Sequence, residues 1–218
     1  LAPYAVPAMI FSVIVKVGFD IIIALGLFVL GCGAMLLLHL FGTMSIWLRF
    51  LAKRDPREFF VQIKDVLVTA FSTSSSSATL PAALAACRER LGIAPSTAGF
   101  VMPLGTTMNM SGTALYEGCV VLFVAQVFGV HLGFAEQVTL VFLSVLSAVA
   151  VAAIPGGSLP LIAGLLVAFG IPPEGIGIIL GVDRLLDMTR TMTNVGSDLV
   201  TTAVVDRGQR ASGHAGRV

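Results

Sequence analysis

One predicted helix carries a stripe of polar residues whose types could bind a charged small molecule or an ion. Between Gly181 and Leu199 the polar residues recur at helical spacing, and a turn of about 100° per residue places them on one face. This face consists of Asp183, Asp187, Arg190, Thr191, Asn194 and Asp198. Ionisable groups inside a membrane are costly and mark substrate or ion paths. The alternative is a structural ion pair between Asp187 and Arg190, which leaves the rest of the face unexplained.

A second polar segment is a run of six hydroxyl residues, Ser72 to Ser77, between apolar stretches. Ser and Thr side chains compete for backbone groups and favour helix caps and turns. A hairpin tip at this run would present backbone N–H groups and hydroxyls to an anionic ligand, as helix N-termini do. A flexible serine linker is the alternative, but linkers of that kind are not embedded between long apolar segments.

A third polar segment lies inside an apolar span, where Pro103, Gly105 and Gly112 surround Asn109 and Thr113. Helix breakers at such a place free backbone carbonyl groups, and hard cations such as sodium take oxygen ligands of that kind. Gly and Pro are also common in ordinary membrane helices. Taken alone, this segment is therefore a weak indication of a cation site.

The composition indicates that these segments lie in a membrane. Of the 218 residues, 56% are hydrophobic and 11% are charged, and the mean hydropathy is +0.97. Soluble globular chains carry about 25% charged residues. A net charge of +1 gives no basis for binding nucleic acid. The chain opens on Leu1 rather than Met, and we expect it to be a fragment of a longer protein.

The basic residues suggest how the chain is threaded. They form three islands, after the first long apolar segment, after the serine run and at the C-terminal end. If basic loops stay in the cytoplasm, all three islands lie on one side of the membrane. The apolar stretch that contains the serine run starts and ends on that side, which predicts a re-entrant hairpin. The stretch 136–170 starts and ends on the other side, with the helix breaker Ile154-Pro155-Gly156-Gly157-Ser158 at its centre.

Two opposed broken hairpins are typical of a transporter with a binding site at the membrane midplane. Two ordinary spans interrupted by loops are the alternative. The sequence has no phosphate-binding loop of the GxxxxGK[ST] type and no GxSxG or HExxH motif, so an ATP-driven pump or an intramembrane hydrolase has no support on this chain. We therefore expect no enzyme. The three cysteines form neither a disulfide framework nor a zinc motif.

Together these segments resemble the dicarboxylate/amino acid:cation symporters, also called the glutamate transporter family. The resemblance rests on four motifs in the order of the family, namely Ser74–Pro81 (SSSSATLP), Asn109–Gly118 (NMSGTALYEG), Ile154–Gly157 (IPGG) and Asp183–Asp198 (DRLLDMTRTMTNVGSD). It covers the C-terminal half of such a carrier. It implies an all-α membrane protein with transmembrane helices and two opposed re-entrant helical hairpins, the transport domain of an elevator-type carrier.

The resemblance also implies a division of the chain. The expected segments are two scaffold-side transmembrane helices (1–48, the first truncated), a cytoplasmic loop (49–57), the first re-entrant hairpin (58–90), a broken transmembrane helix (97–130), the second re-entrant hairpin (136–170), a substrate-binding amphipathic helix (175–206) and a cytoplasmic tail (207–218). By resemblance, the second hairpin is the outer gate that closes over substrate and sodium.

The family's binding residues carry over by position. The residues expected to hold the substrate are Ser75, Ser76, Thr113, Ile154, Gly157, Ser158, Asp187, Arg190, Thr191 and Asn194. In relatives that take acidic amino acids, the Arg position holds the side-chain carboxylate and the Asp position the α-amino group. A planar guanidinium fork suits a carboxylate.

Two sodium sites are expected from the resemblance. The first would use carbonyl groups of Gly105, Asn109 and Asn194 and the carboxylate of Asp198. The second would use the backbone at Thr107, Ala148, Val149 and Val151. The family's usual Asp in its Asn-Met-Asp-Gly-Thr motif is Ser111 here, which removes a charge from a third site. We therefore expect two sodium ions per substrate and no organic cofactor.

The predicted function is sodium-coupled symport of glutamate, aspartate or C4-dicarboxylates. The expected setting is a prokaryotic inner (plasma) membrane, with a homotrimer formed by the full-length protein and contacts with membrane lipid. The alternatives are a proton-coupled dicarboxylate symporter and a non-transporting fragment or pore. A pore needs a continuous polar lining, whereas here the polar residues converge on one patch between apolar segments.

Overall fold

The computed structural model describes residues 20–213, and these residues form helices joined by short loops, with no strand among them. The α-helices are α2 (Asp20–Leu38), α3 (Met44–Trp47), α4 (Pro56–Thr73), α5 (Ser76–Glu89), α6 (Pro95–Met108), α7 (Ser111–Val127), α8 (Phe134–Ala150), α9 (Leu159–Ala168), α10 (Ile176–Leu180) and α11 (Asp183–Ala211). The expected all-α class is confirmed. The first expected scaffold helix lies outside the described residues.

The first long helix is continuous but not uniformly α-helical. The π-helical segment η1 (His39–Thr43) joins α2 to α3, and a second π-helical segment, η2 (Leu48–Ala52), continues α3 to Ala52. The stretch 21–52 is long and apolar enough to cross a membrane by length and composition, as is the stretch 95–127. The helix runs to Ala52, so the non-helical part of the expected 49–57 loop is only 53–55. It stops where Lys53 takes a left-handed conformation with φ of 54°.

The helices α4 and α5 form a hairpin whose local signals are clear in the sequence. Asp55 caps α4, since its Oδ1 accepts hydrogen bonds from the N–H groups of Arg57 (2.9 Å) and Glu58 (3.1 Å). At the other end of α4, Ser74 takes a left-handed conformation, and Ser75 then caps α5 by accepting from the N–H of Ala78 at 3.2 Å. The serine run therefore makes a turn between two capped helices.

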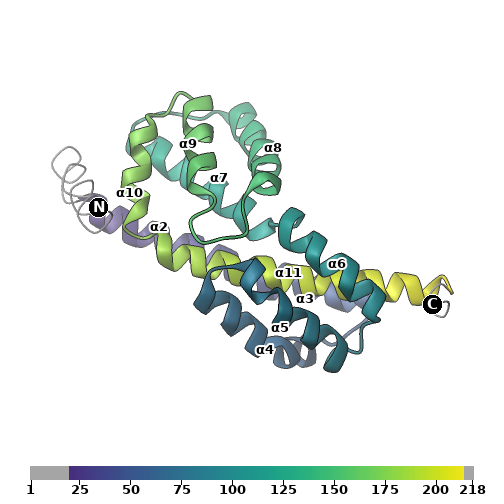
Figure 1. Cartoon of the computed structure of the whole chain (residues 1–218). Helices are drawn as coiled ribbons and strands as arrows, with labels where there is room; N and C mark the ends of the chain where they lie inside the picture. The colour runs from purple at the N-terminus through teal and green to yellow at the C-terminus, as the bar shows by residue number, and fades with distance from the viewer. Residues whose placement is uncertain (1–19, 214–218) are drawn as a thin grey trace.

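The helices α8 and α9 form a second hairpin, joined by the irregular segment 151–158. In Figure 1 this hairpin and α7 and α10 lie towards one end of the molecule, while α4 and α5 lie on the other side of α11. The turn contains Pro155 and Gly156, whose φ is +71°, a conformation that side chains with a Cβ rarely adopt. Whether either hairpin is re-entrant depends on its position in a membrane and stays a prediction.

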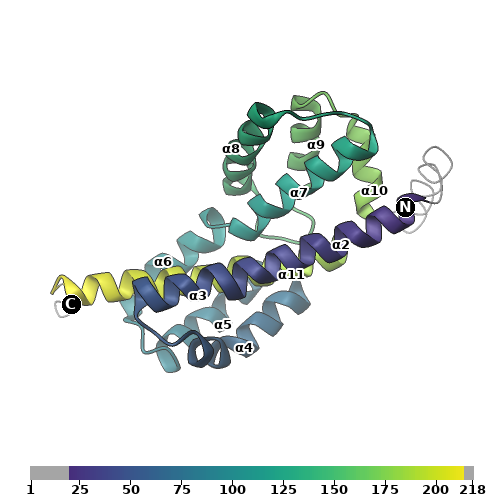
Figure 2. The ribbon, with the colours of Figure 1, turned by 180° about the vertical axis from the view of Figure 1, so that it is seen from behind.

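The helix α11 is the central element of the fold. It packs against α2, α4, α5, α6 and α7, and Figure 2 shows α2 and α3 running along it on the opposite side from that seen in Figure 1. The expected helix 175–206 differs in two respects, because it is interrupted at Gly181 and Val182 and continues to Ala211. The expected cytoplasmic tail (207–218) is therefore helical from its first residue to Ala211.

Two apolar clusters flank the polar stripe of α11. One includes Leu48, Ile63 and Leu199, and the other includes Leu36 and Leu166. In a membrane the gain from burying such side chains comes from close packing rather than from removal of water, because lipid tails are equally apolar. The stripe is thus enclosed between well-packed regions, where a polar group needs a partner within the protein or a ligand.

Candidate functional site

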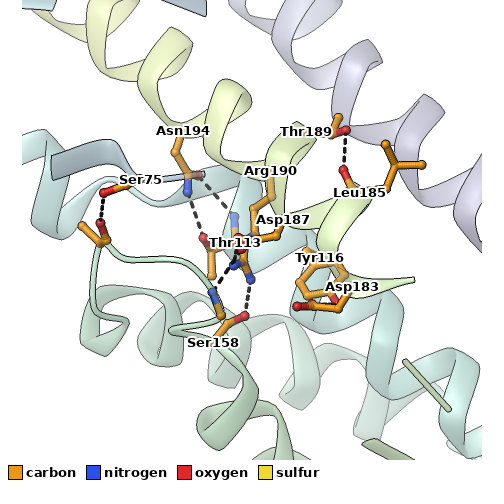
Figure 3. Close-up of polar contacts among 12 residues, drawn as sticks. Ser75, Thr113, Tyr116, Ser158, Asp183, Leu185, Asp187, Thr189, Arg190 and Asn194 are labelled. Carbon is orange, nitrogen blue, oxygen red and sulfur yellow. Dashed lines mark hydrogen bonds and ion pairs between the residues drawn. The ribbon is translucent and has the colours of Figure 1, made fainter. Parts of the chain in front are cut away.

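The guanidinium of Arg190 lies at the centre of the buried polar residues. Arg190 is 3% exposed, and among the described residues it is the only buried Lys or Arg. It donates hydrogen bonds to the carboxylate of Asp187 and to the hydroxyl of Ser158, and it lies over the ring of Tyr116, 5.0 Å from the ring centroid (Figure 3). The charge is therefore matched by one carboxylate and one aromatic face.

The tips of both hairpins meet at this centre. The hydroxyl of Ser75, from the first tip, donates to the carbonyl oxygen of Ala153 in the second tip at 3.0 Å. The N–H of Gly156 donates to Oδ2 of Asp187 at 3.0 Å, while Ser158 accepts from Arg190 (Figure 3). The second tip is thus held to the first tip and to α11 by polar contacts. These contacts bring together predicted residues that lie far apart in the sequence.

A cavity lies between the two tips and α11. Its lining consists of Ser74, Ser76, Met110, Thr113, Val151, Ala152, Ala153, Ile154, Asp187, Arg190, Thr191 and Asn194. Its free volume is about 10 Å³, which is about the space of one water molecule. A molecule the size of an amino acid therefore enters only if part of the lining moves.

Asn194 has a structural role that sequence reasoning did not find. The helix α7 has no cap of its own, because its N-cap residue is Met110. Instead, Oδ1 of Asn194 accepts hydrogen bonds from the N–H groups of Gly112 (2.8 Å) and Thr113 (3.3 Å), and its Nδ2 donates to Oγ1 of Thr113 at 2.9 Å. A side chain of α11 thus caps α7 in the manner of an N-cap residue. The signal lies in the pairing of two distant segments, which one sequence does not reveal.

We expect Gly112→Ala to separate α7 from α11. A Cβ at this position would lie 2.9 Å from the carbonyl oxygen of Arg190 and 3.0 Å from Oδ1 of Asn194, both of which are fixed by the fold. Overpacking of this kind costs about 1–3 kcal/mol. The melting temperature of the purified chain should fall, whereas Gly99→Ala, at an exposed position of α6 where a Cβ meets nothing within 4 Å, should not lower it, because alanine favours a helix more than glycine does. Equal stability of the two variants would contradict this packing.

The residues of the first expected cation site are close together. The carboxylate of Asp198 is 1% exposed; its Oδ1 accepts from Nδ2 of Asn109 at 2.9 Å, and its Oδ2 has no hydrogen-bond partner among the described residues. A Cβ on Gly105 would lie 2.6 Å from the same Oδ1, so the backbone of α6 lies against this carboxylate. A buried carboxylate oxygen without a partner next to backbone carbonyl groups fits a hard cation.

The residues of the second expected cation site lie at the ends of two helices. Here α6 ends at Met108 and α8 ends at Ala150, and the last carbonyl groups of a helix lack partners within it. Both ends contribute to the lining of one cavity of about 320 Å³, through Met108 and Asn109 on one side and Ala148 and Val149 on the other. Helix C-termini that line one cavity favour a cation there through their dipoles. Thr107 does not line this cavity, but it directly precedes Met108, which does. The hydroxyl of Thr107 donates to the carbonyl oxygen of Leu104 at 3.0 Å.

Some predicted residues contribute differently from the way the sequence suggested. The side chain of Ile154 is 58% exposed although the residue lines the cavity. Gly157 does not line the cavity. A Cβ there would lie 2.4 Å from the carbonyl oxygen of Ala152, so its role is to allow the tight turn.

Sequence reasoning missed two neighbours of the site. The hydroxyl of Tyr116 donates to Oδ1 of Asp183 at 2.6 Å, and the ring of the same tyrosine supports Arg190. Ser74 lines the cavity and is buried, and its hydroxyl has no hydrogen-bond partner among the described residues. The only available signal was helical spacing, since Tyr116 follows Thr113 by one turn of α7.

An apolar, all-helical chain in which two helical hairpins and a buried polar helix converge on one charged cavity defines a membrane transport protein. The chain belongs to the sodium:dicarboxylate symporter family, whose model matches residues 1–208. This confirms the resemblance found in the sequence.

Relatives in this family come from bacteria and animals. The chain is 34% identical to the proton/sodium-glutamate symport protein of Bacillus subtilis over 95% of this chain and 48% of that protein. It is 38% identical to excitatory amino acid transporter 4 of Rattus norvegicus, over 84% of this chain and 32% of the relative. It is 35% identical to neutral amino acid transporter B(0) of Mus musculus, over 82% and 32% respectively. The chain thus spans from 32% to 48% of the length of these relatives.

Proposed function

We propose that this chain carries the substrate and cation sites of a secondary active symporter that moves acidic amino acids or C4-dicarboxylates, coupled to sodium. The observation that supports this most directly is the buried ion pair of Arg190 and Asp187 on the wall of a cavity between two hairpin tips. The names of the relatives in Bacillus subtilis and Rattus norvegicus support glutamate and related amino acids as the substrate class.

The ion pair suits a substrate that carries both charges. An acidic amino acid offers a carboxylate that can take the place of Asp187 at the guanidinium of Arg190, and an ammonium group that can then pair with Asp187. Both buried charges remain matched throughout this exchange, so neither is left uncompensated in a site that excludes water. A C4-dicarboxylate supplies only the first of these partners, which favours the amino acid.

The contacts of the second hairpin suggest how binding is linked to movement. Gly156 and Ser158 hold the tip of this hairpin to Asp187 and Arg190, the same two side chains that the substrate would engage. Because substrate and tip compete for these groups, entry of the substrate requires the tip to release them. We propose that segment 151–158 is the gate, in accord with the small free volume of the cavity.

The coupling cations would use both regions described above. Asp198 with the backbone of Gly105 and Asn109 would hold one sodium ion, and the ends of α6 and α8 that line a second cavity would hold the other. We propose a homotrimer for the full-length protein and a plasma membrane as its location, both by family membership. The expected prokaryotic source stays a prediction, because the relatives include animal and bacterial proteins.

Uptake into proteoliposomes tests the proposal. Radiolabelled aspartate and succinate are offered to the protein under an inward sodium gradient, an inward proton gradient, both or neither. Accumulation of aspartate above its external concentration with the sodium gradient alone supports the proposal. Accumulation with the proton gradient alone supports the proton-coupled alternative. Equilibration without accumulation under every gradient indicates a pore, and no flux indicates a non-transporting fragment.

We expect the two hairpin tips to be reached from opposite sides of the membrane. Ser77 at the first tip and Ile154 at the second have exposed side chains, and each can be replaced by cysteine after removal of Cys32, Cys87 and Cys119. A membrane-impermeant thiol reagent should label Ser77→Cys from the cytoplasmic side and Ile154→Cys from the external side. Aspartate with sodium should slow the second reaction. Labelling of both from one side would contradict the inverted hairpins.

A further inference from the structure

Three sulfur atoms from two helices lie together outside the proposed transport site. Cys32 and Met35 lie one turn apart on α2, and Cys119 lies on α7. The Sγ of Cys119 lies 3.6 Å from the Sδ of Met35, and the thiol of Cys32 interacts with the thiol of Cys119. These three residues form a sulfur cluster that the sequence did not reveal, because 84 positions separate Met35 from Cys119.

The sulfur cluster lies at the edge of an apolar core. Cys32 is 3% exposed and belongs to the core that includes Leu36 and Leu166. Met35 and Cys119 are only partly buried and pack against this core. Neither cysteine is in a disulfide. The cluster therefore has one enclosed sulfur atom and two that a small ion can reach, and none of the three residues lines the polar cavity.

The spacing of the sulfur atoms suits a single metal ion. Bonds of about 2.3 Å from one metal ion to its sulfur ligands place those ligands about 4 Å apart. The observed separation of 3.6 Å between Cys119 and Met35 is close to this value, so an ion can bind with small side-chain movements. Because Cys32 and Met35 lie one turn apart on α2, both project to the side of that helix that faces α7.

The ligand types select the metal. Two thiols and a thioether are soft ligands, and sites of this kind favour Cu(I). Structural zinc sites take four ligands, mostly Cys and His, and among the described residues no group of three or more His, Cys, Asp or Glu side chains could hold a metal ion. Cu(I) needs only two or three sulfur ligands, so the cluster is complete for this ion and incomplete for zinc.

We propose that Cys32, Met35 and Cys119 form a binding site for one Cu(I) ion. The ion takes the place of thiol protons, which leave to the solvent, and neither copper nor sulfur changes its oxidation state. A bound ion would join α2 to α7 one turn after Tyr116, the residue whose ring supports Arg190. The inference does not depend on which substrate or coupling ion the protein transports.

The test titrates the purified, reduced chain in detergent with Cu(I), which ascorbate keeps reduced, against the coloured chelator bicinchoninate. Wild type should withhold one Cu(I) ion per chain from the chelator. Even residues that only support metal ligands are worth about 10–100-fold in affinity. Cys32→Ser and Cys119→Ser should therefore each lower the affinity by at least about 100-fold, and Met35→Leu by about 10-fold. Cys87→Ser is the matched control, because Cys87 is equally buried but belongs to the other apolar core.

A count of free thiols separates metal binding from oxidation. When the chelator removes the copper again, wild type should still have three free thiols, whereas a loss of two would show a disulfide and overturn the proposal. Wild type that binds no Cu(I) overturns it without any variant, so the test does not depend on the folding of the variants. An equal loss of affinity in Cys87→Ser shows non-specific binding to thiols. Unchanged affinity in Met35→Leu shows that the thioether is not a ligand, which contradicts the three-sulfur site.

Discussion

Replacement of Arg190 by cysteine is expected to abolish transport of aspartate and succinate and to permit transport of serine or alanine. The guanidinium is the only buried cation among the described residues, and it lies on the cavity wall beside Asp187. Without it, the distal carboxylate of the substrate has no charge partner in a site that excludes water. Asp187 still remains to bind an amino group, which a neutral amino acid also carries.

The expected size of this effect follows from the burial of the pair. Removing one partner of a buried, hydrogen-bonded charge pair costs about 2–5 kcal/mol. At 25 °C this corresponds to a loss of aspartate affinity from about 30-fold to several thousand-fold. The Mus musculus relative, whose sequence is 35% identical to this chain, is named a neutral amino acid transporter.

A control on the same helix separates recognition from general damage. Arg184 lies six residues before Arg190 and is exposed. Arg184→Cys therefore removes the same charge and the same side chain at a position outside the cavity. It should retain aspartate uptake close to wild type. Because Arg190→Cys leaves Asp187 without its partner, each variant is first compared with wild type in melting temperature. A folded Arg190→Cys carrier that binds aspartate as tightly as wild type would refute the assignment.

Local patterns in the sequence were enough to predict the elements that build the site. The period of the polar residues on α11, the serine run 72–77 and the helix breaker 154–158 are local patterns. Residues from all three lie at the cavity or its rim. Cap chemistry at Asp55 and Ser75 is equally local, because each side chain bonds to N–H groups two or three residues ahead.

The contacts that fix the side chains of the site are not local, and a single sequence does not reveal them. Asn194 caps α7 across 82 positions of the chain, and Tyr116 supports Asp183 across 67. The π-helical segment at His39 has no compositional signal, since its residues are ordinary for an apolar helix. The break at Gly181 was missed for a similar reason, because a lone glycine in a helical pattern is commonly tolerated.

Asp198→Asn is expected to raise the stability of the chain without sodium and to remove the stabilisation that sodium provides. The wild-type carboxylate is buried, and one of its oxygens has no hydrogen-bond partner among the described residues. A buried charge without full compensation is destabilising, so a neutral amide of the same shape that still accepts from Asn109 should be more favourable. The same amide offers a sodium ion no charge.

The measurement is the melting temperature of both proteins as a function of sodium concentration, together with sodium-driven aspartate uptake. Wild type should gain about 2.7 kcal/mol at a sodium concentration 100 times the dissociation constant. For Asp198→Asn the gain should vanish over the same range, and uptake should be lost. Asp206→Asn is the matched control on the same helix, because both carboxylate oxygens of Asp206 are engaged, by the N–H of Ala94 and by Arg210.

The two aspartates should therefore respond in opposite ways. Asp206→Asn removes an ion pair with Arg210 and should lower the melting temperature without sodium, while the rise on adding sodium persists. Asp198→Asn should raise the melting temperature without sodium and abolish the rise. If Asp198→Asn retains the wild-type response to sodium, the cation is bound elsewhere and the assignment of Asp198 to the sodium site is wrong.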